Sequence, residues 1–93
     1  MNEPLNQQEV RRLIREILAN GVYWTSSHAQ AEMRKDGLTE LDVVNVLRGG
    51  VVEPGEWENG SWRYQLRTQR IVVVVAFDSE TELSVVTAWR NQK

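Results

Sequence analysis

Residues 62–89 read WRYQLRTQRIVVVVAFDSETELSVVTAW, and this stretch decides the fold. From Trp62 to Thr68, aromatic and apolar residues alternate with polar ones, which is typical of a strand with one buried face. Ile71 to Phe77 is apolar throughout, which indicates a central strand that is covered on both faces. A turn at residues 78–81 then leads into a last strand over about residues 82–89. The stretch therefore predicts three consecutive antiparallel strands.

The chain before this stretch adds a fourth strand. Residues 51–57 form a weak β-prone run that Pro54 interrupts, so we expect a strand at the edge of the sheet. Its link to the next strand is Glu58-Asn59-Gly60-Ser61, and an Asn-Gly step is typical of a hairpin turn. Residues 22–25 are either a short strand or an extended connection. Together these segments predict a meander of four antiparallel strands.

Apolar residues in the N-terminal part recur with the period of a helix. They follow the positions i, i+3, i+4, i+7 and i+8, namely Val10, Leu13, Ile14, Ile17 and Leu18. This spacing predicts an amphipathic helix over residues 4–19. A second helix is expected from Ser27 until Gly37, and a third from Thr39 until Gly49. We therefore predict a single domain over residues 1–93 of class α+β, with three helices packed on a small antiparallel sheet of about four strands.

Composition limits the classes of protein to consider. The 93 residues suffice for one small core, and the absence of cysteine excludes disulfides and thiolate chemistry. We expect a cytoplasmic protein without membrane contact, because no apolar run resembles a signal peptide or a membrane span. The net charge is −2, with ten acids and six bases in residues 1–58 but three acids and five bases in residues 59–93. This excludes a basic footprint over the whole domain and leaves room for a local basic patch.

The only histidine, His28, stands where a β-prone run turns into a helix. A helix start presents unpaired N–H groups and the positive end of the helix dipole, which favour the neutral imidazole. Such a side chain could accept a proton near neutral pH. One histidine without cysteine or a cluster of carboxylates does not make a metal site, so we expect no metal and no cofactor.

Several short motifs over about residues 23–90 resemble one family. They are Ser26-Ser27-His28-Ala29, Met33, Asp36-Gly37-Leu38-Thr39, the segment 43–49 and Val85-Val86-Thr87-Ala88-Trp89. The pattern resembles a small uncharacterised bacterial domain family that is grouped with the RelE/ParE-type plasmid toxins. The resemblance implies a few helices against an antiparallel sheet and a role in a toxin–antitoxin pair. RelE-type members cut RNA and ParE-type members inhibit gyrase. The resemblance thus favours a toxin-like, metal-independent RNA endonuclease.

RNA cleavage without a metal needs a base for the 2′-hydroxyl proton, cations for the charged phosphorane and an acid for the leaving oxygen. His28 matches the helix-start histidine of the family and is the predicted base, and Thr87 matches its final-strand threonine. Two arginines on one strand face could clamp a phosphate, and Tyr64 on the other face could donate a proton or stack on a base. The predicted catalytic residues are His28, Tyr64 and Thr87, and the predicted phosphate- or RNA-binding residues are Arg63, Arg67 and Arg90.

A structural role is the alternative for each of these residues. His28 could cap or pack against its helix, and the arginines could protect a solvated outer strand from aggregation. Thr87 alternates with Leu83, Val85 and Trp89, and it could share their half-buried face.

The competing hypothesis is a non-enzymatic protein-binding module on the same fold. It is favoured by the acidic helical half and by Glu32, which stands where the resembled family often has arginine. The expected partners are a cognate antitoxin protein and RNA or the ribosome under the first hypothesis. Under the second they are another protein or a second copy of the chain in a homodimer.

Overall fold

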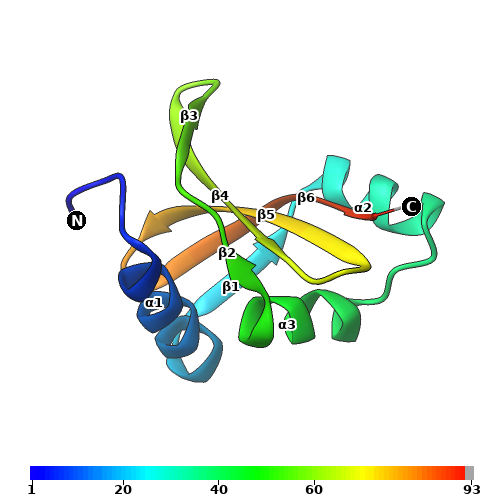
Figure 1. Ribbon diagram of the computed structural model, residues 1–93, viewed down its shortest axis with the longest axis horizontal. Coiled ribbons are helices and arrows are strands. Elements are labelled where there is room, and N and C mark those ends of the chain that lie inside the picture. Colours follow the sequence, from blue (N-terminus) through cyan, green and yellow to red (C-terminus); the bar gives the residue numbers. More distant parts are fainter. Residues whose placement is uncertain (92–93) are drawn as a thin grey trace.

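The computed structural model describes residues 1–91, which contain three helices and six strands (Figure 1). In chain order these elements are α1 (Gln7–Asn20), β1 (Val22–Thr25), α2 (Ser27–Lys35), α3 (Glu40–Gly49), β2 (Val51–Val52), β3 (Glu56–Glu58), β4 (Ser61–Arg67), β5 (Ile71–Ser79) and β6 (Glu82–Arg90). The sheet has the strand order β1-β6-β5-β4-β2, and β3 also pairs with β4. Helices α1 and α3 lie below the sheet in Figure 1, and the β3–β4 turn projects from its other side. The architecture is therefore α+β, as predicted.

Each helix begins at a side chain that caps its free N–H groups. Asn6 and Glu9 form a reciprocal capping box at the start of α1, with N–H to oxygen distances of 2.9 and 3.0 Å. The helix therefore begins at Gln7, three residues later than the sequence predicted. Ser26 caps α2, and its hydroxyl accepts a hydrogen bond from the Ala29 amide. The predicted start of the second helix at Ser27 is confirmed.

The sheet is larger than the four strands predicted. The expected strand over residues 51–57 is divided into β2 and β3, because Pro54 lacks the N–H that a continuous ladder needs. Residues 22–25 are a strand, and β1 pairs with β6 in parallel, from Val22 opposite Glu82 onward. Strands β4, β5 and β6 are antiparallel as expected. The sheet is therefore mixed, with its one parallel pairing at the β1 edge among the described residues.

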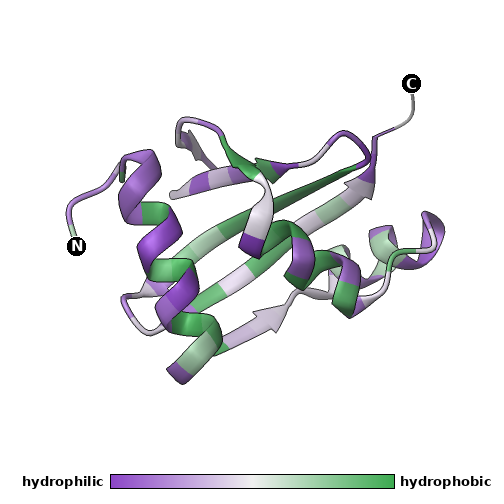
Figure 2. Ribbon diagram, turned by 60° about the horizontal axis from the view of Figure 1, so that its bottom comes forward, coloured by the Kyte–Doolittle hydropathy of each residue, from purple (hydrophilic) through white to green (hydrophobic). Residues whose placement is uncertain are grey.

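The core lies between the sheet and the two helices beneath it. Figure 2 shows α1 and α3 side by side over this face, each with hydrophobic residues among hydrophilic ones. The largest fully buried side chains are Tyr64, Ile14, Ile17, Leu66, Leu83, Val10, Val43, Val46, Val73, Val75 and Val85. Four of the five apolar positions that predicted the first helix are buried in this core, and Leu18 lies half-buried against it. The helical period therefore identified the packed face of α1 correctly.

A bulge in β6 changes which side chains face away from the helices. The β5–β6 pairing shifts between Val74, opposite Thr87, and Val75, opposite Val85, so that Val86 is the additional residue. Val85 is fully buried in the core, whereas Thr87 lies on the opposite face of the sheet. The expectation that Thr87 shares a face with Leu83, Val85 and Trp89 is therefore wrong for Leu83 and Val85, because a simple alternation does not pass through a bulge. Trp89 does lie on the same face as Thr87.

No helix within residues 1–91 combines the length and the apolar character needed to cross a membrane.

Candidate functional site

A groove of about 610 Å³ lies on the sheet face that α1 and α3 leave uncovered, and we call it the open-face groove. One wall is the chain from Glu53 to Glu58, which folds back along β4. The floor is formed by side chains of three neighbouring strands. These are Arg63, Gln65 and Arg67 from β4, Val74 from β5, and Thr87 and Trp89 from β6. The groove therefore collects two of the predicted arginines and the predicted threonine in one place.

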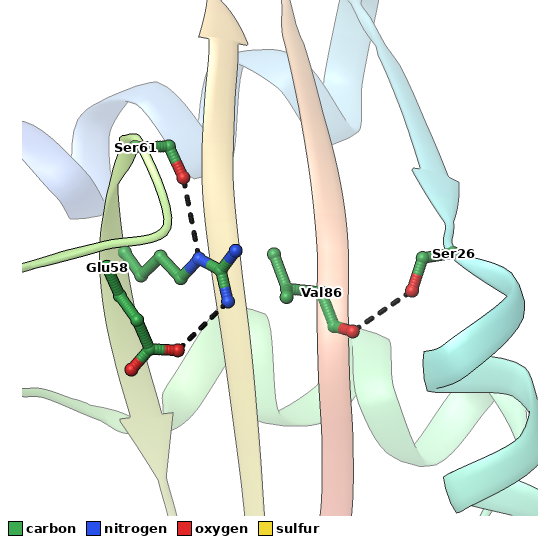
Figure 3. A network of polar contacts seen from close by, with 5 residues as sticks. Ser26, Glu58, Ser61 and Val86 are labelled. Carbon is green, nitrogen blue, oxygen red and sulfur yellow. Dashed lines mark hydrogen bonds and ion pairs between the residues drawn. The ribbon is translucent and has the colours of Figure 1, made fainter.

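Both arginines of the groove are paired with carboxylates of its wall. The Arg63 guanidinium lies 3.1 Å from a Glu58 oxygen and donates to the Ser61 hydroxyl at 3.4 Å (Figure 3). The Arg67 Nε lies 2.7 Å from a Glu53 oxygen. Such exposed pairs contribute about 0–1 kcal/mol each, so an incoming anion can displace the glutamates. The glutamates hold the arginine side chains in position and leave them able to bind an anion.

The open-face groove is not a basic site. Three glutamates and two arginines line it, which leaves one net negative charge. The excess of bases in residues 59–93 is therefore offset by acids from residues 53–58, which the fold brings against them. The local basic patch that the charge distribution allowed does not form on this face.

Helix α2 begins beside the strand that carries Thr87. The Ser26 hydroxyl donates to the Val86 carbonyl at 3.0 Å, and the Ser26 amide donates to the Val85 carbonyl at 3.1 Å. Figure 3 shows Val86 between Ser26 on one side and the side chains of Glu58 and Ser61 on the other. His28 follows in the first turn of α2 and is exposed. His28 does not line the groove. It stands two residues after Ser26, the residue that ties the start of α2 to β6.

Tyr64 does not face the groove. Its side chain is fully buried on the helix-covered side of the sheet, and its ring packs against Phe77 at a centroid distance of 5.6 Å. The hydroxyl accepts from the Leu5 amide at 2.9 Å and donates to a Glu3 oxygen at 2.8 Å. Burial above all, together with the Glu3 carboxylate, raises the pKa of Tyr64 to about 12, against the opposing effect of the Leu5 N–H. Tyr64 therefore anchors the N-terminal segment and reaches no ligand in the groove.

Arg90 also lies outside the groove. Its amide donates to the Asp36 carboxylate at 2.7 Å, and its guanidinium donates to the carbonyls of Asp36 and Gly37 at 3.1 and 3.4 Å. A cation at the C-terminus of a helix complements the negative end of the helix dipole. Arg90 thus joins the end of α2 to β6, and its guanidinium is not directed to the site of the other two arginines.

The acids of the groove wall were not among the residues that the sequence predicted for the site. Glu58 and Glu53 reach their arginines because the chain reverses at the Asn59-Gly60 turn, where Asn59 and Gly60 both have positive φ. The hairpin was the signal that could have found Glu58, since it places residues 56–58 beside residues 61–63 of β4.

A family model described as a domain of unknown function (DUF4258) matches residues 25–90. The chain belongs to the DUF4258 family. The matched region runs from the last residue of β1 through β6, so it includes His28 and the whole open-face groove. No curated protein and no solved structure matches the chain. The resemblance to an uncharacterised domain family is thus confirmed, while the grouping of this DUF4258 domain with the RelE/ParE toxins stays a prediction.

The chemistry available in the DUF4258 domain is proton transfer and anion recognition. Within residues 1–91, no three or more histidine, cysteine, aspartate or glutamate side chains are grouped in a way that could hold a metal ion. His28 offers a proton acceptor, and the two arginines of the groove offer planar cations that fit phosphate or carboxylate oxygens.

Proposed function

We propose that this domain binds RNA along the open-face groove and cleaves it without a metal, as a toxin-like endonuclease. The observation that carries the proposal is the arrangement of three predicted residues on one face of the sheet. Arg63, Arg67 and Thr87 line one groove, and Ser26, which caps the helix that carries His28, is hydrogen-bonded to the strand of Thr87.

In this proposal His28 accepts the proton of an RNA 2′-hydroxyl. The 2′-oxygen attacks the adjacent phosphorus, the bond from phosphorus to the 5′-oxygen breaks, and the 5′-oxygen takes a proton from water. The products are a 2′,3′-cyclic phosphate and a 5′-hydroxyl. Arg63 and Arg67 stabilise the charge that develops on the phosphorane oxygens, as planar cations do. Tyr64 takes no part, because its hydroxyl is occupied in the core.

The wall of glutamates fits a selective enzyme rather than a general RNA binder. A phosphate must displace Glu58 and Glu53 from the arginines, and the net negative charge of the groove repels polyanions that make few other contacts. We expect weak binding to arbitrary RNA, with a salt dependence that corresponds to about two phosphate contacts.

The deciding experiment incubates the purified chain with RNA in EDTA, once alone and once with ribosomes, and follows the ends of the products. We expect cleavage with 2′,3′-cyclic phosphate ends, reduced about 100-fold or more by His28→Ala. Arg34→Ala is the matched control, because Arg34 is an exposed residue of the same helix outside the groove. Intact RNA in both settings would remove the proposal.

A non-enzymatic protein-binding module is the second candidate, and the paired state of Arg63 and Arg67 favours it. Exposed Trp24 and Trp57, with 47% and 62% of their surface accessible, would then serve as contact residues. Light scattering after size exclusion tests self-association. A strictly monomeric chain that also cleaves RNA would count against this candidate.

A further inference from the structure

A second groove, of about 370 Å³, lies between α1 and α3 on the other side of the sheet. We call it the α1–α3 groove. Its apolar lining consists of Ile14, Leu18, Ala19 and Leu47, and its charged lining consists of Arg11, Arg15 and Arg48. No acid is among these lining residues, so the groove carries three positive charges on a chain whose net charge is −2. This groove, and not the open-face groove, is the concentrated basic site of the described residues.

The arginines of this groove differ from those of the open-face groove in their partners. Arg63 and Arg67 are neutralised by glutamates, whereas no acid of the described residues lies within ion-pair distance of Arg11, Arg15 or Arg48. Arg11 donates from one terminal nitrogen to the Gly50 carbonyl at 2.7 Å, which fixes its position and leaves its charge uncompensated. Arg15 and Arg48 are exposed. Like charges gathered without counterions favour an anionic ligand.

The spacing of the charges fits carboxylates on a helix, and the apolar floor between the charges favours a helix over a phosphate chain. Arg11 and Arg15 lie one turn apart on α1, about 6 Å along its axis, and Arg48 faces them from α3. Carboxylates four residues apart on a bound helix would have the same repeat. The floor between the arginines is apolar; Ile14 and Leu47 are almost fully buried in the core, so the apolar surface open to a ligand belongs mainly to half-buried Leu18 and exposed Ala19. Such a floor accepts leucine-like side chains and offers a sugar–phosphate backbone nothing.

We propose that the α1–α3 groove binds an acidic amphipathic helix of a partner protein. The apolar stripe of that helix packs on Leu18, Ala19 and Leu47, and its glutamates or aspartates pair with the three arginines. The proposal stands apart from RNA cleavage, because the two grooves lie on opposite sides of the sheet and share no residue. Arg11 and Arg15 also lie outside the region that the family model matches.

The probe for the test is a fluorescein-labelled helical peptide of about four turns. It carries leucines along one face and glutamates four residues apart beside them, and a second peptide carries glutamine in place of every glutamate. Fluorescence anisotropy is measured with the full chain. We expect saturable binding of the acidic peptide with a Kd below about 1 mM, weakening as salt is added, and at least tenfold weaker binding of the glutamine peptide.

Variants of exposed arginines locate the binding. Arg15→Gln and Arg48→Gln should each weaken binding about twofold to fivefold, with unchanged thermal unfolding because neither guanidinium makes a hydrogen bond to the described residues. Arg12→Gln is the matched control: Arg12 lies on α1 outside the groove, paired with Glu16. We expect its affinity to equal that of the parent chain.

Four results would overturn the proposal. The first is no saturable binding of the acidic peptide, and the second is an equal loss of affinity in Arg12→Gln and Arg15→Gln. The third is amide chemical shift changes confined to the open-face groove rather than to α1 and α3. An RNA oligonucleotide that competes for the α1–α3 groove more strongly than the acidic peptide would also reject a helical partner.

Discussion

The hydroxyl of Tyr64 holds the first residues of the chain against the sheet, and removing it with Tyr64→Phe should destabilise the domain. The hydroxyl accepts from the Leu5 amide and donates to Glu3, while the aromatic ring packs in the core beside Phe77. Phenylalanine keeps that ring and its packing, so the change isolates the two hydrogen bonds. Leu5 is itself buried, and its N–H would be left without a partner.

The expected loss follows from these contacts. A buried N–H that loses its acceptor destabilises by about 1–3 kcal/mol, and the hydrogen bond to the partly exposed Glu3 adds about 0.5–1 kcal/mol. We therefore expect a loss of roughly 2–3 kcal/mol, which is a large part of the stability of a small domain.

Urea unfolding followed by tryptophan fluorescence measures this loss as a lower midpoint at an unchanged m-value. Hydrogen exchange at the Leu5 amide should accelerate in the variant, while the amides of β5 change only with global stability. Glu3→Gln keeps a side-chain oxygen that can accept the hydrogen bond of the Tyr64 hydroxyl. This variant should lose less than half as much free energy of unfolding as Tyr64→Phe. A change below about 0.5 kcal/mol in Tyr64→Phe would refute the role of the hydroxyl as an anchor.

Three further outcomes are expected. The pKa of Tyr64 is raised to about 12 in the fold, so its contribution to stability is fully present below about pH 10 and is lost as the pH rises to about 12. In urea unfolding at different pH values, the parent chain should lose roughly 2–3 kcal/mol of unfolding free energy relative to Tyr64→Phe over that range. A Cβ at Gly55 would lie 2.6 Å from the Tyr64 ring, so Gly55→Ala should destabilise by about 1–3 kcal/mol, whereas Gly49→Ala, with open space around the added atom, should leave the melting temperature unchanged or higher. Hydrogen bonds from the Thr39 amide and hydroxyl lower the pKa of Asp42, so its stabilising effect is present above the ordinary carboxyl pKa range and is lost as the pH falls. The melting temperature of Asp42→Asn should therefore fall less on acidification than that of the parent chain. An equal fall would contradict this role.

Local patterns predicted most of the fold because they depend only on neighbours in sequence. The helical period of α1, the Asn-Gly turn and the apolar run of β5 all appear where the sequence placed them. The opposition of Tyr64 to Arg63 and Arg67 also followed from alternation along one strand. None of these features requires knowledge of a distant residue.

What the sequence could not predict depends on contacts between distant segments. The bulge at Val86 decides which face Thr87 occupies, and it arises from the fit of β6 to β5. The place of Arg90 outside the groove and the part of the acids near Pro54 could not be predicted, because their partners come from other elements of the chain. The face on which a site residue lies can be predicted when the alternation of its own strand sets it. Its contacts cannot be predicted when a distant segment supplies the partner.

The parallel pairing at the sheet edge has a consequence for biosynthesis. β1 leaves the ribosome before β6, and the backbone of Val22 finds its partner only after Glu82, 60 positions later, has been made. At about 5–20 residues per second, the nascent strand stays unpaired for seconds. Chaperones can then bind its exposed Trp24, or Trp24 can drive aggregation, so the order of translation makes β1 vulnerable in the nascent chain.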